Sequence, residues 1–182
     1  PTAVGGYTSE GNVAIVGGSA GGMLVGACLN LRPQLFRAIV AHVPFVTVLD
    51  TMLDASLPLT PGEFKEWGNP REAGYFDYMR EYCPYENVDA KSPLLDRKGR
   101  YPSVFATTGL TDYRVGYYEG AKWIARMRAQ IKQAKREAAE KDDGGAELTA
   151  LKSREPLVVM ETNMAAGHAG ASGRFDRLKE GS

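Results

Sequence analysis

A serine flanked by glycines follows a short apolar run near the start of the chain. The pattern is Gly17-Gly18-Ser19-Ala20-Gly21, with β-branched residues before it and an apolar, helix-like segment after it. A strand, a sharp turn and a helix are the setting of a nucleophile elbow, where glycines avoid clashes and the serine hydroxyl is exposed. This setting favours an elbow over a plain Gly/Ser turn. It predicts Ser19 as a nucleophile and the N–H of Ala20, at the positive helix end, as an oxyanion donor.

A nucleophilic serine needs an acid and a histidine, which in this type of fold follow it in that order along the chain. The chain has two histidines. His168 lies in a glycine-rich segment after an apolar run, whereas His42 lies inside an apolar segment, where we expect a buried histidine with satisfied hydrogen bonds. Asp112 follows another apolar run. Ser19, Asp112 and His168 would each lie just past the carboxyl end of a strand, where catalytic groups gather in open α/β sheets.

More than one aspartate could be the acid, because other aspartates also lie between the serine and the second histidine. These are Asp50, Asp54, Asp77, Asp89 and Asp96. Only Asp112 immediately follows a predicted strand, through Gly109. The position therefore favours Asp112 as the acid.

Composition limits the classes of function that remain. The 182 residues are enough for one domain with a substantial core, and 43% hydrophobic with 24% charged residues is typical of a soluble globular protein. The net charge of zero gives no sign of a nucleic-acid or membrane partner, and no apolar run approaches the ~20 residues that span a bilayer. Cys28 and Cys83 form neither a disulfide framework nor a C-x-x-C motif, and we expect Cys28 to be buried. Since neither cysteine has a C-x-x-C partner, we expect no metal, and we expect no cofactor. No leader is visible, so we expect a cytoplasmic protein.

Strands and helices alternate along the predicted chain. We expect strands over 13–17, 36–43, 102–108 and 156–161, with the second strand in the interior of the sheet. We expect helices over 20–31, 46–53, 74–82 and about 117–140, and the start of another at 175–179. Residues 45–100, with a loop at 57–62, form an irregular insertion of the kind that lines or covers an active site, and 141–155 form a surface loop.

This order of elements predicts a parallel sheet with right-handed crossovers. Together with the elbow, it predicts an α/β-hydrolase fold, specifically the C-terminal half of a doubly wound, mostly parallel sheet. A nucleophile elbow usually follows several strands of its sheet, but here its strand comes after only twelve residues. We therefore interpret the chain as part of a catalytic domain whose first strands are missing.

Several longer motifs accompany the elbow. They include Leu29-Asn30-Leu31-Arg32-Pro33, Val43-Pro44-Phe45-Val46, Gly62-Glu63-Phe64 with Glu66-Trp67-Gly68-Asn69-Pro70, Pro84-Tyr85-Glu86-Asn87-Val88, Thr108-Gly109-Leu110 with Asp112, and Gly167-His168 with Gly173-Arg174-Phe175. Through them almost the whole chain resembles the prolyl oligopeptidase family of serine peptidases, in its oligopeptidase B branch. The Glu-Trp-Gly-Asn-Pro and Pro-Tyr-x-Asn-Val runs are more specific than the elbow and distinguish this branch from generic esterases.

The resemblance implies cleavage of short peptides after Arg or Lys. It also implies an N-terminal β-propeller that restricts access, and a second oxyanion donor, a tyrosine, both in the region that the chain would lack. A basic side chain needs a carboxylate partner, and Glu63 matches an acidic position of the family. The second acidic position, two residues on, is Lys65 here, a departure that Glu66 could offset. From the residues alone, a solvated loop face is an equally good interpretation of Glu63 and Glu66.

Two other functions compete with the peptidase. One is a related α/β-hydrolase, either an esterase or an aminopeptidase, with the same acyl chemistry and a different pocket. The other is an inactive remnant or interaction module that keeps only the fold. The presence of Ser19, Asp112 and His168 argues against the second. We expect the parent protein to be an active peptidase and the chain alone to be inactive or weakly active, because a half-sheet would expose an apolar edge.

Overall fold

One parallel sheet organises the chain in the computed structural model, which describes residues 8–89, 101–141 and 156–170. Its strands are β1 (Val13–Gly18), β2 (Phe36–His42), β3 (Ser103–Gly109) and β4 (Val158–Asn163). They lie in the order β1-β2-β3-β4 and every pair is parallel. All carboxyl ends therefore meet at one edge of the sheet. The interior position predicted for the second strand is confirmed, because β2 pairs with both β1 and β3.

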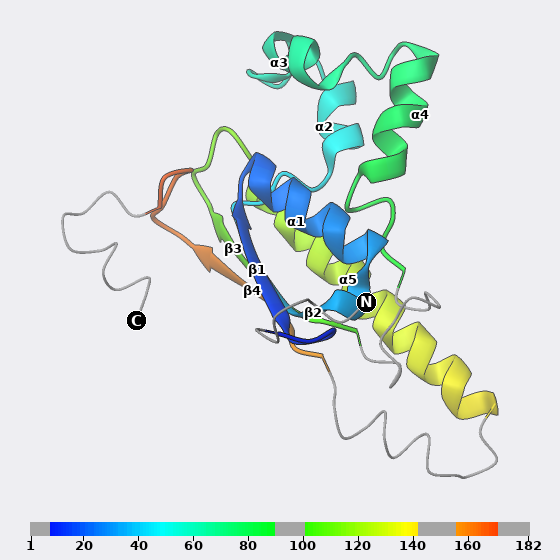
Figure 1. Ribbon diagram of the computed structural model, residues 1–182. Helices are drawn as coiled ribbons and strands as arrows, with labels where there is room; N and C mark the ends of the chain where they lie inside the picture. Colours follow the sequence, from blue (N-terminus) through cyan, green and yellow to red (C-terminus); the bar gives the residue numbers. More distant parts are fainter. Residues whose placement is uncertain (1–7, 90–100, 142–155, 171–182) are drawn as a thin grey trace.

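Two helices cover the same face of this sheet (Figure 1). They are α1 (Ala20–Leu31) and α5 (Tyr117–Lys141). Fully buried Leu29 of α1 and Trp123 of α5 share a core with Ile39 of β2 and Val104 of β3. Residues of β1 alternate between partly buried and exposed, and Val16 on the other face is 64% exposed. The alternation follows from the two-residue period of a strand, of which only one face is covered within the described residues.

Three shorter helices stand beyond the edge where the strands end (Figure 1). They are α2 (Val48–Leu53), α3 (Thr60–Trp67) and α4 (Ala73–Tyr82), and a 3₁₀ turn, η1 (Pro33–Leu35), follows α1. A second apolar cluster joins this layer to the sheet edge, because Phe45 and Val115, which follow β2 and β3, pack with Met52 of α2 and Met79 of α4. The insertion thus has its own small core above the carboxyl edge.

Most predicted elements are confirmed, with shifts at their ends. The predicted strand 36–43 ends at His42, and the predicted strand 156–161 is displaced to 158–163. The loop predicted at 57–62 is wrong in its second half, since α3 begins at Thr60. Pro61 is compatible with that start because the first helical N–H groups need no intrahelical partner. The predicted loop beyond 141 and the helix at 175–179 lie outside the described residues.

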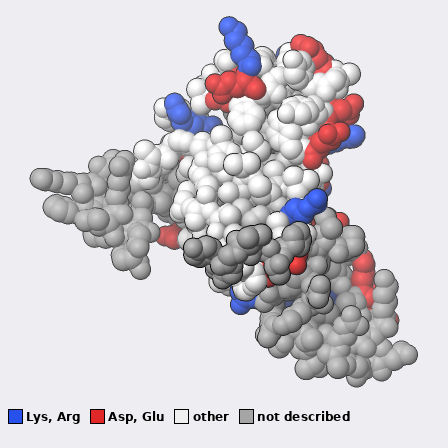
Figure 2. All heavy atoms as spheres, viewed as in Figure 1, with Lys and Arg blue, Asp and Glu red and all other residues white. Residues whose placement is uncertain are grey.

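The surface differs between the two layers. On the face shown in Figure 2, charged side chains gather over α3 and α4, whereas α1 contains no charged residue.

Both cysteines are free; Cys83 is buried, but Cys28 is partly exposed and the prediction of its burial was wrong. Among the described residues, no helix combines the length and the apolar character needed to cross a membrane.

Candidate active site

The serine of the predicted elbow sits between β1 and α1 in a strained backbone conformation. Ser19 has φ 54° and ψ −120°, and such a positive φ is uncommon for a residue other than glycine. Its N–H donates to the carbonyl of His42 over 2.9 Å. Its own carbonyl accepts from the backbone N–H groups of Gly22, Met23 and Phe45. These bonds fix the strained turn to both the helix and the neighbouring strand end.

Two glycines are required where the elbow is tightest. A Cβ on Gly17 would lie 2.2 Å from the carbonyl oxygen of Gly21, and one on Gly22 would lie 2.7 Å from Cα of Pro44. Neither distance is possible without moving the backbone. Around Gly21, by contrast, no described atom outside its own helix lies within 4 Å of such a Cβ. The expectation that both glycines of the G-x-S-x-G pattern avoid a collision was therefore confirmed for Gly17 and wrong for Gly21.

The three residues predicted to do chemistry come together through two hydrogen bonds. His168 Nε2 lies 3.1 Å from Oγ of Ser19, and Nδ1 lies 2.8 Å from Oδ2 of Asp112. A carboxylate only accepts, so Nδ1 carries the proton and Nε2 is left to accept from the serine hydroxyl. The Asp112 side chain is 0% exposed and that of His168 is 19% exposed. The imidazole is thus reachable from outside while its acidic partner is shielded.

The aspartate is held from its other side by its own loop. Oδ1 of Asp112 accepts the backbone N–H groups of Arg114 at 2.8 Å and Val115 at 3.0 Å. With Oδ2 directed at the imidazole, both carboxylate oxygens are engaged. This pattern orients the side chain and satisfies a carboxylate that is removed from water.

The residue predicted as the oxyanion donor lies at the start of α1. Ala20 is the first residue of α1 and directly follows Ser19. The first N–H groups of a helix have no intrahelical acceptor. The N–H of Ala20 can therefore serve an anion that develops beside the serine, with support from the helix dipole.

The sequence as a whole matches one known family. The profile of the Prolyl oligopeptidase family matches residues 2–181, nearly the entire chain. The chain belongs to this family. Its fold is accordingly the α/β-hydrolase fold of the family's catalytic domains, as predicted.

Individual relatives are named as peptidases, and a similar solved structure is an oligopeptidase B. The chain is 47% identical to Protease 2 of Moraxella lacunata and 43% identical to dipeptidyl aminopeptidase BI of Pseudoxanthomonas mexicana, in each case over 96% of its length. It matches the structure of oligopeptidase B from Trypanosoma brucei with covalently bound antipain at 39% identity and a TM-score of 0.73, over 97% of this chain and 21% of that one. The chain spans about a fifth of the length of both curated relatives, 21% and 20%.

The other histidine of this family member is not the buried residue that the sequence predicted. His42 is exposed, and its Nδ1 lies 2.9 Å from the hydroxyl of Thr107. Its strand neighbour Ala41 is 0% exposed and faces the helices, so His42 faces the other way. The apolar segment was misleading because a strand covered on one face still exposes alternate residues.

The two candidate specificity residues lie on α3 and differ in burial and contacts. Glu63 is partly buried and accepts a 3.2 Å hydrogen bond from Nε1 of Trp67. The Trp67 ring makes an edge contact with the Phe45 ring, with 5.3 Å between the ring centroids. The backbone N–H of Phe45 donates to the carbonyl of Ser19. Glu66 and Lys65 are both exposed. Contacts thus lead from Glu63 to the elbow, whereas Glu66 lies on the solvated side of the helix.

One buried acid was not singled out from the sequence. Glu119, in the first turn of α5, is 1% exposed and accepts hydrogen bonds from Val46, Thr47 and Thr51. The second half of the same helix is highly charged, and nothing in the sequence around Glu119 distinguishes it from the acids there. Among the described residues, no group of three or more His, Cys, Asp and Glu side chains is arranged to hold a metal ion.

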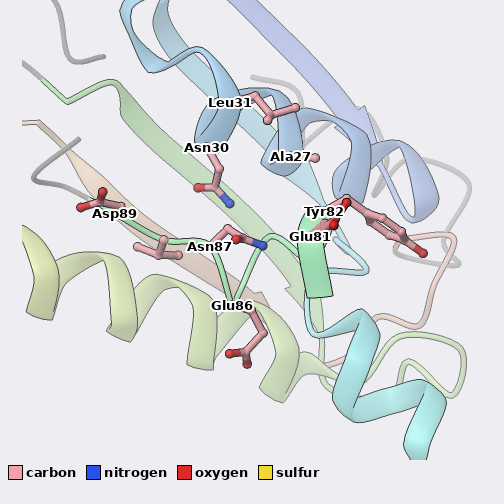
Figure 3. Close-up of a pocket in the computed structure, with 9 residues that line it drawn as sticks. Ala27, Asn30, Leu31, Glu81, Tyr82, Glu86, Asn87 and Asp89 are labelled. Atoms are coloured by element: carbon pink, nitrogen blue, oxygen red, sulfur yellow. The ribbon is translucent and has the colours of Figure 1, made fainter. Parts of the chain in front are cut away.

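A separate pocket lies along the C-terminal half of α1 (Figure 3). Asn30 of α1 faces Asn87 across it, and acidic side chains come from the segment that follows α4 and from α4 itself (Figure 3). None of Ser19, Asp112 and His168 lines this pocket. Since Ser19 precedes the opposite end of α1, the pocket is distinct from the candidate active site.

Proposed function

We propose that the protein is a serine-type oligopeptidase that hydrolyses short peptides after Arg or Lys through an acyl-enzyme. The observation that carries this proposal is the continuous chain of hydrogen bonds from Ser19 through His168 to Asp112 at the carboxyl edge of the sheet. Membership of the prolyl oligopeptidase family supports the same chemistry.

Acylation begins with attack of the Ser19 oxygen on the carbonyl carbon of the scissile bond. His168 Nε2 accepts the hydroxyl proton, and the carbonyl oxygen becomes an oxyanion beside the N–H of Ala20. One such donor is typically worth about 3 kcal/mol in the transition state. The C–N bond then breaks as His168 returns the proton to the leaving amine, which leaves an ester on Ser19.

Deacylation repeats the sequence with water. His168 removes a proton from the water, the new C–O bond forms, and the ester bond breaks as the proton returns to the Ser19 oxygen. Asp112 remains a carboxylate throughout. It holds Nδ1–H in place and stabilises the imidazolium that forms in each half of the reaction.

Glu63 is our candidate for recognition of the basic side chain. A carboxylate binds a guanidinium through two parallel hydrogen bonds, and the partly buried position of Glu63 shields such a pair from screening water. A relative named oligopeptidase B, from Trypanosoma brucei, supports a substrate class of short peptides. The exposed Glu66 contributes less on this interpretation.

One observation favours a second candidate function. The 43% identical relative from Pseudoxanthomonas mexicana is named a dipeptidyl aminopeptidase, which implies release of dipeptides from a free N-terminus. The acyl chemistry at Ser19 would be unchanged. Only the recognition of the substrate N-terminus separates this candidate from an endopeptidase.

A fluorophosphonate probe tests the shared chemistry. In the parent protein we expect labelling at Ser19, located by mass spectrometry and abolished by Ser19→Ala and His168→Ala. A folded protein that stays unlabelled would contradict the proposal and favour the non-enzymatic alternative. Arg-coumarin peptides with blocked or free N-termini then separate the two peptidases, since only an endopeptidase cleaves the blocked series efficiently.

A further inference from the structure

The turn that follows β2 is strained and touches the nucleophile elbow. Val43 has φ 39°, a left-handed conformation that is a genuine outlier for a β-branched residue. Its N–H donates to the carbonyl of Thr107 over 2.7 Å. Pro44 packs so closely on Gly22 that no side chain fits there, and the N–H of Phe45 donates to the Ser19 carbonyl over 3.1 Å. The position of the elbow therefore depends on this turn.

A buried carboxylate holds the far end of the same turn. Oε2 of Glu119 accepts the consecutive backbone N–H groups of Val46 at 3.0 Å and Thr47 at 2.9 Å. Oε1 accepts the hydroxyl of Thr51 over 3.1 Å. A buried charge persists only where hydrogen bonds replace its water, and here the donors come from the turn and from α2. Glu119 thus fixes a segment that would otherwise relax its strain at Val43.

The acid of the candidate active site belongs to the same unit. The loop that carries Asp112 leads directly into α5, where Glu119 lies in the first turn. Between them, the N–H of Val115 donates to Asp112 while its side chain packs in the cluster that contains Phe45. Movement of the turn would therefore disturb the serine on one side and the setting of the acid on the other.

We propose that Glu119 is a positioning residue whose carboxylate holds the strained turn 43–47 against the carbonyl of Ser19. The inference rests on the proposed hydrolase function and adds a residue that contacts neither the substrate nor the reacting atoms. Strain at a functional site persists only where the surroundings over-determine it. Glu119 supplies that constraint from α5.

The first test compares Glu119→Ala with Glu119→Gln in the full protein. Active sites are counted by fluorophosphonate titration, and the peptide hydrolysis rate is expressed per titrated site. We expect Glu119→Ala to lower this rate about tenfold, equivalent to about 1.4 kcal/mol. Glu119→Gln should retain most activity because its carbonyl still accepts both backbone N–H groups. A purely structural residue would lower the number of sites and leave the rate per site unchanged, which would overturn the proposal.

The second test removes the backbone strain at Val43 instead of the Glu119 carboxylate. Glycine adopts a positive φ without steric cost, so Val43→Gly should leave the wild-type rate per site nearly unchanged but raise that of Glu119→Ala by about threefold. Additive effects of the two substitutions would overturn the proposal. If Glu119→Ala alone gives no titratable sites, recovery of sites in the double variant supports the positioning role of Glu119. No recovery overturns it.

A matched control and the wild type complete the design. Asp50→Asn removes an exposed acid of α2 that pairs over 2.6 Å with Lys122, which lies on α5 as Glu119 does. We expect a wild-type rate because exposed ion pairs contribute little. A wild-type protein that is not labelled at Ser19 would refute the proposed function itself. A labelled, active wild type with an unimpaired Glu119→Ala variant would refute only the role of Glu119.

Discussion

The imidazole of His168 and the carboxylate of Asp112 meet at 2.8 Å although 56 residues separate them in the chain. The parallel pairing of β3 with β4 brings them together, because Asp112 follows the end of one strand and His168 follows the end of the other. Ser19 reaches the same point from β1, two strands away. The order of strands in the sheet, and not nearness in sequence, therefore creates the site.

Asp112→Asn tests the proposed role of the acid. The amide can place N–H donors where the carboxylate accepted, which favours the wrong imidazole tautomer. We expect kcat to fall by roughly 10⁴, as for the corresponding change in the serine protease triad that serves as the general template. The acylation rate is measured under single-turnover conditions, with release of the first product as the signal. Asp77→Asn, an exposed acid on α4 that pairs with Arg80, is the control and should retain full activity.

Gly17→Ala and Gly21→Ala form a matched pair within the elbow. We expect Gly17→Ala to destabilise the protein by roughly 3 kcal/mol or more, because its Cβ would lie 2.2 Å from a backbone oxygen. Gly21→Ala meets open space and lies inside α1, so it should be neutral or stabilising by up to about 1 kcal/mol. Urea unfolding of both variants provides the measurement. Equal destabilisation by the two would contradict this account of the motif.

Ser19, Asp112 and His168 could be singled out from the sequence because each follows an apolar run of strand length. Such residues share a sheet edge in any parallel α/β fold, whatever the details of packing. Glu119 could not be found in this way. Its burial depends on how α5 packs against the turn after β2, a long-range contact without a local signal. His42 was misjudged because which face of a strand is covered depends on the crossovers, not on the strand's own residues.

Substitutions on α3 test the specificity proposal. Glu63→Gln should lower kcat/KM for Arg and Lys substrates by about tenfold to a hundredfold, since a hydrogen bond to a charged group is worth about 1.5–3 kcal/mol. Esters with uncharged side chains should be affected little. Glu66→Gln, on the exposed side of the same helix, is the matched control and should change neither series. Equal losses on basic and uncharged substrates would instead indicate a structural role for Glu63 through Trp67.

The two cysteines should differ in reactivity. Burial raises the pKa of the Cys83 thiol, against hydrogen bonds that lower it, so little thiolate forms near neutral pH. Cys28 is partly exposed on α1. We expect iodoacetamide to modify Cys28 first and Cys83 only in denaturant, with both positions assigned by mass spectrometry. Early modification of Cys83 in the folded protein would show that the core of the α2–α4 layer opens readily.

The stability of the fold should depend on pH through Glu119. Burial raises the pKa of this carboxyl above its usual value, while hydrogen bonds from Thr47, Thr51 and Val46 oppose the shift. The folded protein therefore holds the proton more tightly than the unfolded chain does. The resulting contribution to stability is fully present below the unfolded pKa and is lost as pH rises through the folded pKa.

Glu119→Gln, which cannot titrate, isolates this contribution. The free energy of unfolding of the wild type, minus that of the variant, should be largest in acid and should decrease as the pH rises above about 4.3. Urea unfolding of both proteins between about pH 4 and pH 8 measures the difference. A difference that increases with pH would mean that the hydrogen bonds outweigh burial and lower the pKa of Glu119.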